Sequence, residues 1–232
     1  MRDLLETLLN NLKIQVPSVL YLKDPESSAL GRRILDHSIQ LIDRVGFEEF
    51  TFRKLGQELS SAESTMYRYF ENKHMLLLYL TSWYWSWLEY RVAFRTTNLE
   101  DPETKLCGAL EAILAQAQYE KSYPHIDPAA LQRIVIAESS KAFLTKSVDE
   151  ENRNGYFNSY KQLCLRLSRI MEELSPHYPY PRSLASTVME GVLNQQFLAQ
   201  HLPSLSDLKG PGIEGIGFYK SLVLSTIRHG QS

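Results

Sequence analysis

The sequence has 232 residues, of which 44% are hydrophobic and 22% are charged, and its formal net charge is −2. This balance is that of an ordinary globular protein, and the length provides for one large domain or for a small domain joined to a larger one. Because the chain is not basic overall, a nucleic-acid partner must be argued from a local motif. The two cysteines, Cys107 and Cys164, argue against a disulfide-rich scaffold and a thiolate metal site, and they suit a reducing cytoplasm.

Neither a membrane span nor a secretory signal is expected. The longest strongly apolar run, from Met75 to Leu80, is too short to cross a bilayer. The acidic residues Asp3 and Glu6 lie within the first cluster of leucines, which is not the pattern of a signal peptide. We therefore expect a cytoplasmic protein with no membrane partner.

The first elements are helices, because apolar residues recur at helical spacing and no segment alternates as a strand does. Residues 1–27 are expected to form an N-terminal extension with a short amphipathic helix over 3–13. Ser27 or Ser28 is expected to cap the next helix, which Gly46 ends.

Two short helices follow and complete a three-helix unit over residues 28–73. Thr51 is expected to cap the first of them, which ends at Leu59. The run Ser60-Ser61-Ala62-Glu63 has the spacing of a capping box and is expected to open the second, which continues through Phe70.

The remaining residues, 74–232, are expected to form a second, all-helical domain. The clearest pattern is one apolar stripe over residues 149–174, which predicts a single long helix. Further helices are expected at about 72–96, 101–121, 128–145, 181–202 and 213–228, with prolines falling between several of these blocks. The predicted fold class is therefore all-α, with an N-terminal helix-turn-helix domain and a C-terminal helical domain.

The third helix of the N-terminal unit has the character of a DNA-recognition helix. Small and polar residues stand at its start, where a recognition helix must approach base edges without a bulky apolar face. The stretch from Thr65 to Lys73 reads Thr-Met-Tyr-Arg-Tyr-Phe-Glu-Asn-Lys. Together with Gly46-Phe47 and the segment Thr51–Leu59, it resembles the signature of the tetracycline-repressor (TetR) family of bacterial regulators. The resemblance covers about 45 residues of the 232.

This resemblance implies a role for each matching residue. Met66, Tyr69 and Phe70 would face the core of the three-helix unit, and Lys73 would hold a phosphate at the start of the next helix. The residues implied in DNA binding are Arg53, Ser61, Ala62, Glu63, Ser64, Thr65, Tyr67, Arg68 and Lys73, of which Ala62, Glu63 and Ser64 stand at the positions that read the base sequence.

The sequence also departs from the family pattern. Ser60-Ser61 stands in the turn where glycine is usual, and a residue other than glycine at positive φ costs about 1 kcal/mol there. Glu63 stands where a neutral or basic residue is common. Residues 28–74 contain seven Lys or Arg and seven Asp or Glu, so nonspecific attraction to phosphate is expected to be weak. Two alternatives stay open: Arg53 pairs with Glu49 or Glu58, and the unit is a protein-interaction module that has lost DNA binding.

The C-terminal domain is expected to bind a small effector and to dimerise. Aromatic residues suit a pocket for an organic molecule, although such clusters more often form a core. The effector-binding candidates are Trp83, Tyr84, Trp87 and Tyr160. The last two helices combine apolar and small residues, and the family dimerises through its last two long helices; the alternative is packing within one chain. The interface candidates are Leu184, Val188, Val192, Ile216, Val223 and Ile227.

No enzyme activity, cofactor or metal site is expected. The six histidines include no ligand pair at i,i+4, and no catalytic constellation or glycine-rich phosphate loop stands out. The predicted function is that of a transcriptional regulator, and specifically a repressor, that binds a double-stranded DNA operator as a homodimer under the control of an unidentified small molecule.

Overall fold

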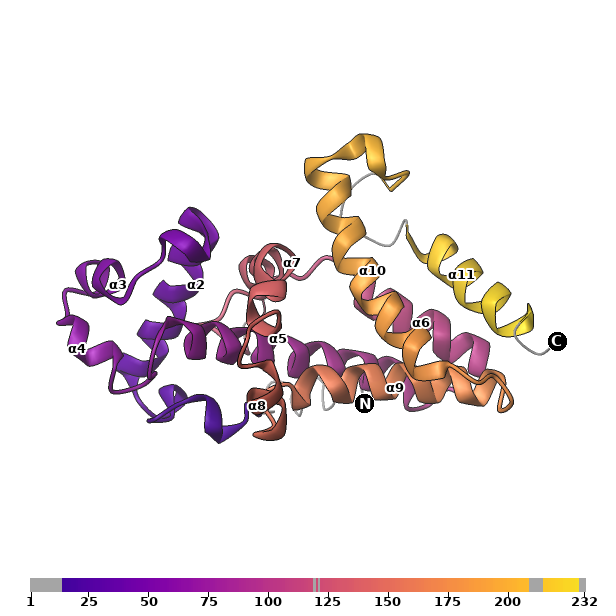
Figure 1. Ribbon diagram of the computed structural model, residues 1–232, viewed down its shortest axis with the longest axis horizontal. Helices are drawn as coiled ribbons and strands as arrows, with labels where there is room; N and C mark the ends of the chain where they lie inside the picture. Colours follow the sequence, from indigo (N-terminus) through magenta and orange to yellow (C-terminus); the bar gives the residue numbers. More distant parts are fainter. Residues whose placement is uncertain (1–13, 119, 121, 209–214, 230–232) are drawn as a thin grey trace. The chain divides into compact units, whose positions relative to one another are not determined.

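The computed structural model describes residues 14–118, 120, 122–208 and 215–229. Over these ranges the chain is all-α and contains no strand, as the sequence predicts (Figure 1). The helix expected over residues 3–13 lies outside the described residues. The chain divides into two compact units, one made of the residues up to Tyr84 with Ala117–Asn158, and the other of Trp85–Gln116 with Ser159 onward. The domain limits predicted from sequence, 28–73 and 74–232, stay predictions.

The first unit begins with two short 3-10 helices, η1 (Ser18–Leu20) and η2 (Pro25–Ser27), followed by α2 (Ala29–Glu49). Of the two predicted caps, Ser28 is the one used, because its hydroxyl accepts from the backbone N–H of Gly31 at 3.0 Å. Gly46 adopts φ 78° and interrupts α2, and one more turn follows to Glu49. A positive φ of this kind favours glycine.

The residues from Leu20 to Pro25, which precede α2, pack closely against the three-helix unit. A β-carbon on Gly31 would lie 2.1 Å from the carbonyl oxygen of Pro25, so only glycine admits η2 at this distance. The N–H of Leu22 donates to the carbonyl of Tyr69 at 2.8 Å, and the side chain of Leu20 is fully buried. The N-terminal segment is therefore part of the packed structure of this unit.

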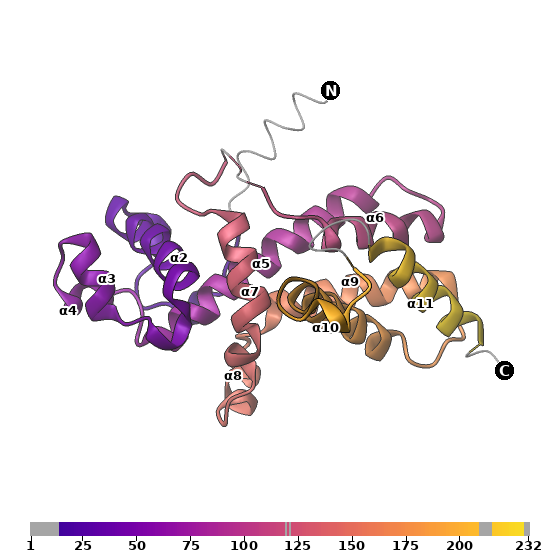
Figure 2. The same cartoon turned by 90° about the horizontal axis from the view of Figure 1, so that it is seen from above.

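The rest of the first unit comprises α3 (Phe52–Leu59), α4 (Glu63–Met66), the first half of α5 (Lys73–Thr96), α7 (Pro128–Phe143) and α8 (Val148–Arg153). Helices α2, α3 and α4 form the predicted three-helix unit (Figure 1). Helix α7 packs against α2 (Figure 2).

Polar contacts from α7 reach the last turns of α2. Arg133 is paired with Asp43, with Nη2 at 2.6 Å from Oδ2, and the N–H of Phe47 donates to Oε1 of Glu138 at 3.1 Å. This N–H is released from the helical pattern by the interruption at Gly46, and the buried carboxylate of Glu138 satisfies it.

The second unit comprises the second half of α5, α6 (Pro102–Leu114), α9 (Asn158–Leu174), α10 (Pro181–His201), η3 (Pro203–Leu205) and α11 (Ile216–His229). Both α10 and α11 pack against α6. Three of the predicted boundaries are wrong. The helix predicted to continue through Phe70 ends at Met66, and the helix predicted over 101–121 ends at Leu114. The single helix predicted over 149–174 is split between α8 and α9, because Gly155 adopts φ 82°.

Most of the residues predicted to form a dimer interface are buried within a single chain. Five of the six are buried within a single chain, and Ile216 is half-buried. The buried ones are Leu184, Val188, Val192, Val223 and Ile227. We correct the assignment of these five residues, since an apolar face that already packs against its own chain does not offer a surface to a partner. The alternative of packing within one chain holds for these five side chains, and the assignment of Ile216 stays a prediction.

None of the helices in the described part of the chain has the length and apolarity that crossing a bilayer requires.

Candidate nucleic-acid interface

The turn between α3 and α4 is built by residues that the sequence singles out. Thr51 caps α3 as predicted, its hydroxyl accepting from the N–H of Lys54 at 3.2 Å. Ser60 adopts φ 52°, ψ 41°, so it occupies the left-handed position usually given to glycine. A β-carbon on Gly56 would lie 2.8 Å from the carbonyl oxygen of Ser61, so the chain crosses α3 closely at this glycine.

The predicted capping box at Ser60–Glu63 is wrong. Ser60 ends α3, where its N–H donates to the carbonyl of Gln57, and it does not cap α4. Ala62 stands at the N-cap of α4 and supplies no side-chain hydrogen bond. The first turn of α4 is therefore without a side-chain cap.

Helix α4 and the turn after it have one buried and one exposed face. Met66, Tyr69 and Phe70 are buried, as the resemblance implies. The predicted DNA-binding residues lie on the other side: Ala62, Glu63, Ser64, Tyr67 and Arg68 are exposed, and Ser61 and Thr65 are half-buried.

Tyr67 is held in place on this exposed face. Its ring lies edge-on to Phe52 with centroids 5.0 Å apart, and its hydroxyl donates to Oε1 of Glu63 at 3.4 Å. The side chain remains 48% exposed. A pre-oriented aromatic hydroxyl beside polar residues is suited to contact a phosphate or a base edge.

Arg53 on α3 is exposed, and the proposed partners for it are otherwise engaged. Glu49 pairs with Lys54 at 3.1 Å, and Glu58 pairs with Arg44. Among the described residues neither Arg53 nor Arg68 has an ion-pair partner. Both guanidinium groups are therefore free to meet an anion, and the alternative pairing of Arg53 is wrong.

Lys73 has a different role from the predicted phosphate contact. Its ammonium donates to the carbonyls of Phe47, Glu48 and Phe50 at 3.1, 3.0 and 3.2 Å, and it lies 4.8 Å from the ring centroid of Phe47. An ammonium has three protons, and all three are used by the carbonyls that end α2. The geometry corrects the sequence-based assignment and makes Lys73 a cap on α2.

Lys73→Met is therefore expected to lower the free energy of unfolding by about 1.5–3 kcal/mol, because three carbonyls lose a charged donor. Chemical denaturation measures this change. Lys146→Met is the control, since Lys146 is exposed between α7 and α8. An unchanged midpoint for Lys73→Met would contradict the capping role.

The aromatic residues proposed for an effector pocket lie in both units. Trp83 and Tyr84 are buried in the first unit, where Trp83 lies edge-on to Tyr123 at 5.1 Å. Trp87 is buried and Tyr160 half-buried in the second unit. Their role in binding an effector stays a prediction.

Tyr160 is engaged with its own unit. Its hydroxyl donates to Oε1 of Glu190 at 2.6 Å, and its ring lies 5.0 Å from that of Trp85. Burial, together with the neighbouring Cys164 and Glu190, raises the pKa of Tyr160, so the phenol stays protonated. Burial also raises the pKa of the Cys164 thiol to about 11, which makes it a poor nucleophile.

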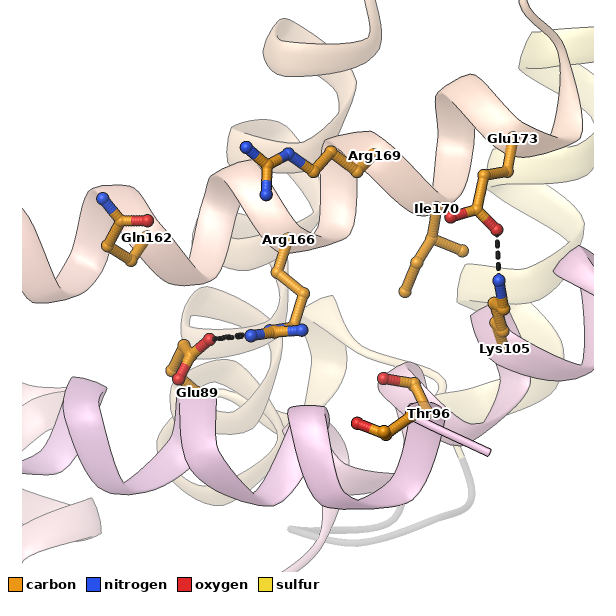
Figure 3. A pocket seen from close by; sticks show the side chains of 9 residues that line it. Glu89, Thr96, Lys105, Gln162, Arg166, Arg169, Ile170 and Glu173 are labelled. Atoms are coloured by element: carbon orange, nitrogen blue, oxygen red, sulfur yellow. Dashed lines mark hydrogen bonds and ion pairs between the residues drawn. The ribbon is translucent and has the colours of Figure 1, made fainter. Parts of the chain in front are cut away.

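The second unit contains a polar cavity that was not predicted from the sequence (Figure 3). None of the four aromatic candidates lines it. A signal was present, since Arg166 and Arg169 stand one turn apart beside the apolar stripe of α9. Within the described ranges, no group of three or more His, Cys, Asp or Glu side chains gathers as metal ligands would.

Comparison with known proteins places the N-terminal domain in a family. Residues 34–80 match the model of the bacterial regulatory proteins of the tetR family. No curated protein matches the chain. Solved structures with the same fold include the fatty acid degradation regulator FadR from Bacillus halodurans, at 17% identity and a TM-score of 0.57, covering 83% of this chain and 96% of that chain.

Two further solved structures show the same likeness. The ketosteroid transcriptional regulator KstR2 of Mycobacterium tuberculosis has 12% identity and a TM-score of 0.52, covering 94% of this chain and 98% of that chain. AibR, in complex with isovaleryl coenzyme A and operator DNA, has 16% identity and a TM-score of 0.54, covering 83% and 96% of the two chains. At these identities the likeness concerns the fold alone.

Proposed function

Because this chain belongs to the TetR family of bacterial regulatory proteins through its N-terminal domain, we propose that it is a cytoplasmic transcriptional repressor that binds operator DNA. The observation that carries the proposal is the exposed face of α3 and α4. It combines the unpaired guanidinium groups of Arg53 and Arg68 with the oriented hydroxyl of Tyr67 and an uncapped helix start. Such a face offers phosphate contacts on either side of a short helix that can enter the major groove.

We further propose that a small molecule bound in the C-terminal part modulates operator binding. AibR, a protein of the same fold, is known in complex with both isovaleryl coenzyme A and operator DNA, so the fold accommodates both kinds of partner. A ligand that binds one conformation more tightly than another shifts the DNA affinity by that difference in affinity.

Dimerisation is proposed through the outward face of α11 and not through its buried face. Phe218 is 53% exposed, and a β-carbon on Gly217 would meet no atom within 4 Å. Ser221 and Ser225 follow Gly217 at intervals of four residues and are exposed, so small residues line this face beside Phe218. Small residues allow two helices to approach closely, and a two-fold dimer would bury the exposed phenyl ring. Binding to two successive major grooves would require the recognition helices of such a dimer to lie about 34–36 Å apart, one turn of B-DNA.

Arg53→Ala and Arg68→Ala are each expected to weaken binding to the DNA upstream of the gene and to reduce the salt dependence of binding by about two units of slope for a dimer. The reason is that each change removes one phosphate contact from each of the two protomers. Fluorescence titration at several salt concentrations measures both quantities. Arg153→Ala, which removes an exposed arginine at the end of α8, is the control. Equal affinities for all three variants and the unmodified protein would count against the DNA-binding face.

Glu63→Ala is expected to change which bases are preferred more than how tightly DNA is held. A carboxylate accepts from the N4 amino group of cytosine and is repelled by phosphate, so a contact by Glu63 would be selective. Selection of sites from random DNA should yield a different consensus for the variant. An identical consensus would leave Glu63 only its contact with Tyr67.

The second candidate, a protein-interaction module, is favoured by one observation, the equal numbers of acidic and basic residues over 28–74. The two functions separate in a competition gel shift, because a module that has lost DNA binding gives no shift with the upstream DNA at low salt.

A further inference from the structure

The second unit contains a cavity of about 220 Å³ between α5, α6 and α9. Most of the side chains around it are polar or charged, and the side chain of Ile170 points into the space (Figure 3). The lining residues are Glu89, Thr96, Thr97, Lys105, Gln162, Arg166, Arg169, Ile170 and Glu173. A cavity of this size and character is suited to a small polar molecule and not to a large apolar one.

Two of the three cations around the cavity are held by carboxylates. Glu89 accepts from Nε and Nη2 of Arg166 at 2.7 and 2.5 Å, and Lys105 lies 2.5 Å from Glu173 (Figure 3). These ion pairs fix the side chains that close the space at two places.

Arg169 is the third cation, and within the described part of the chain it has no carboxylate partner. It lies one turn after Arg166 on α9, and it is exposed. Three cations face two carboxylates, so one positive charge at the cavity is uncompensated. A half-enclosed space with one excess positive charge attracts an anion, and a guanidinium pairs with a carboxylate or phosphate through two parallel hydrogen bonds.

The side of the cavity across from Arg169 provides hydrogen-bond acceptors. Thr96 is the last residue of α5 and Thr97 follows it, and their hydroxyls donate to the carbonyls of Val92 and Ala93 at 2.8 and 2.7 Å. Because these protons are engaged, the hydroxyl oxygens are left to accept from a ligand. In Figure 3, Thr96 lies across the cavity from Arg169. A ligand that meets both walls carries an anionic group at one end and a hydroxyl donor at the other.

We propose that this cavity binds a small hydroxylated organic anion, with its carboxylate or phosphate on Arg169 and its hydroxyl on Thr96. A short carbon chain between the two groups lies against Ile170. Binding of the anion requires no DNA and does not depend on the proposed function. Its role as the effector rests on the proposed function.

The test is isothermal titration calorimetry of the full chain without DNA. The probes are L-malate and glycerol 3-phosphate, which separate a carboxylate from a phosphate ligand, and their uncharged analogues malamide and glycerol. We expect at least one anion to bind and neither analogue to do so. Arg169→Gln is expected to weaken this binding by about tenfold or more, since a charge-assisted contact is lost.

Two variants make the test specific. Arg182→Gln removes an exposed arginine from the first turn of α10 in the same unit and should leave the affinity unchanged. Thr96→Val keeps the side-chain shape and should weaken the binding of malate but not of succinate, which lacks the hydroxyl. The proposal is overturned if neither anion binds at millimolar concentration, or if Arg169→Gln and Arg182→Gln bind equally well.

Operator titrations of the same protein separate the two proposals. An anion that binds through Arg169 but leaves DNA affinity unchanged supports the site and removes its role as effector. DNA binding by a protein that takes up neither anion supports the regulator and overturns the site.

Discussion

Val223→Asp is expected to destabilise the second unit and not simply to dissociate a dimer. The side chain of Val223 has no exposed surface in a single chain, where α11 packs against α6. A carboxyl group at this position would be buried among apolar atoms without a partner, which costs several kcal/mol whether the group ionises or stays protonated. An uncompensated buried charge costs about 3–5 kcal/mol, which lowers the melting temperature of a chain of this size by roughly 6–20 °C.

Phe218→Asp is the matched variant, because it lies five residues earlier on the same helix and is 53% exposed. It should keep the melting profile of a folded protein and yield monomers that bind DNA weakly, since two linked half-site contacts are lost. Calorimetry and light scattering together distinguish the cases. An unchanged melting temperature for Val223→Asp would contradict the assignment of Val223 to the core, and a dimeric Phe218→Asp protein would contradict the proposed interface.

Gly31→Ala is expected to destabilise the N-terminal unit by about 3 kcal/mol, because the new methyl group would meet backbone atoms and not a side chain that can turn away. The carbonyl oxygen of Pro25 would lie 2.1 Å from it, so η2 would have to leave the surface of α2. Displacement of η2 would strain the hydrogen bond from the N–H of Leu22 to the carbonyl of Tyr69. Tyr69 directly follows Arg68 in the turn after α4.

Urea denaturation measures this loss, and Gly108→Ala provides the control. Gly108 also lies within a helix, but a β-carbon there would make contacts of 3.5 Å or longer. This control should be neutral or slightly stabilising, as alanine favours a helix. Equal stability of the two variants would mean that η2 can be displaced from α2 without a loss of folding free energy.

The N-terminal unit was predictable because its chemistry is local. The hydroxyl of Thr51 accepts from an N–H three residues ahead, and Ser60 adopts the left-handed conformation between two short helices. Both depend on neighbours within a few residues, which a sequence displays directly. The role of Lys73 was missed because its three acceptors lie 23 to 26 residues earlier in the chain.

The C-terminal half was less predictable for a different physical reason. An apolar helical stripe has the same pattern whether it meets its own chain or a partner, so Val192 and Val223 were assigned to the wrong surface. The cavity escaped notice because its cations and carboxylates come from three helices, α5, α6 and α9, and only the fold shows which cation is left without a carboxylate.

The contact between Glu138 and Phe47 has a consequence for synthesis on the ribosome. The carboxylate that satisfies the Phe47 N–H lies 91 residues later in the chain, on a helix that also covers α2. At translation rates of about 5–20 residues per second, Glu138 is added roughly 5–20 s after Phe47. During that interval the end of α2 has an unpaired N–H and an uncovered face. The nascent N-terminal unit therefore completes its folding only after α7 has emerged, and a chain truncated before α7 would leave α2 accessible to chaperones and proteases.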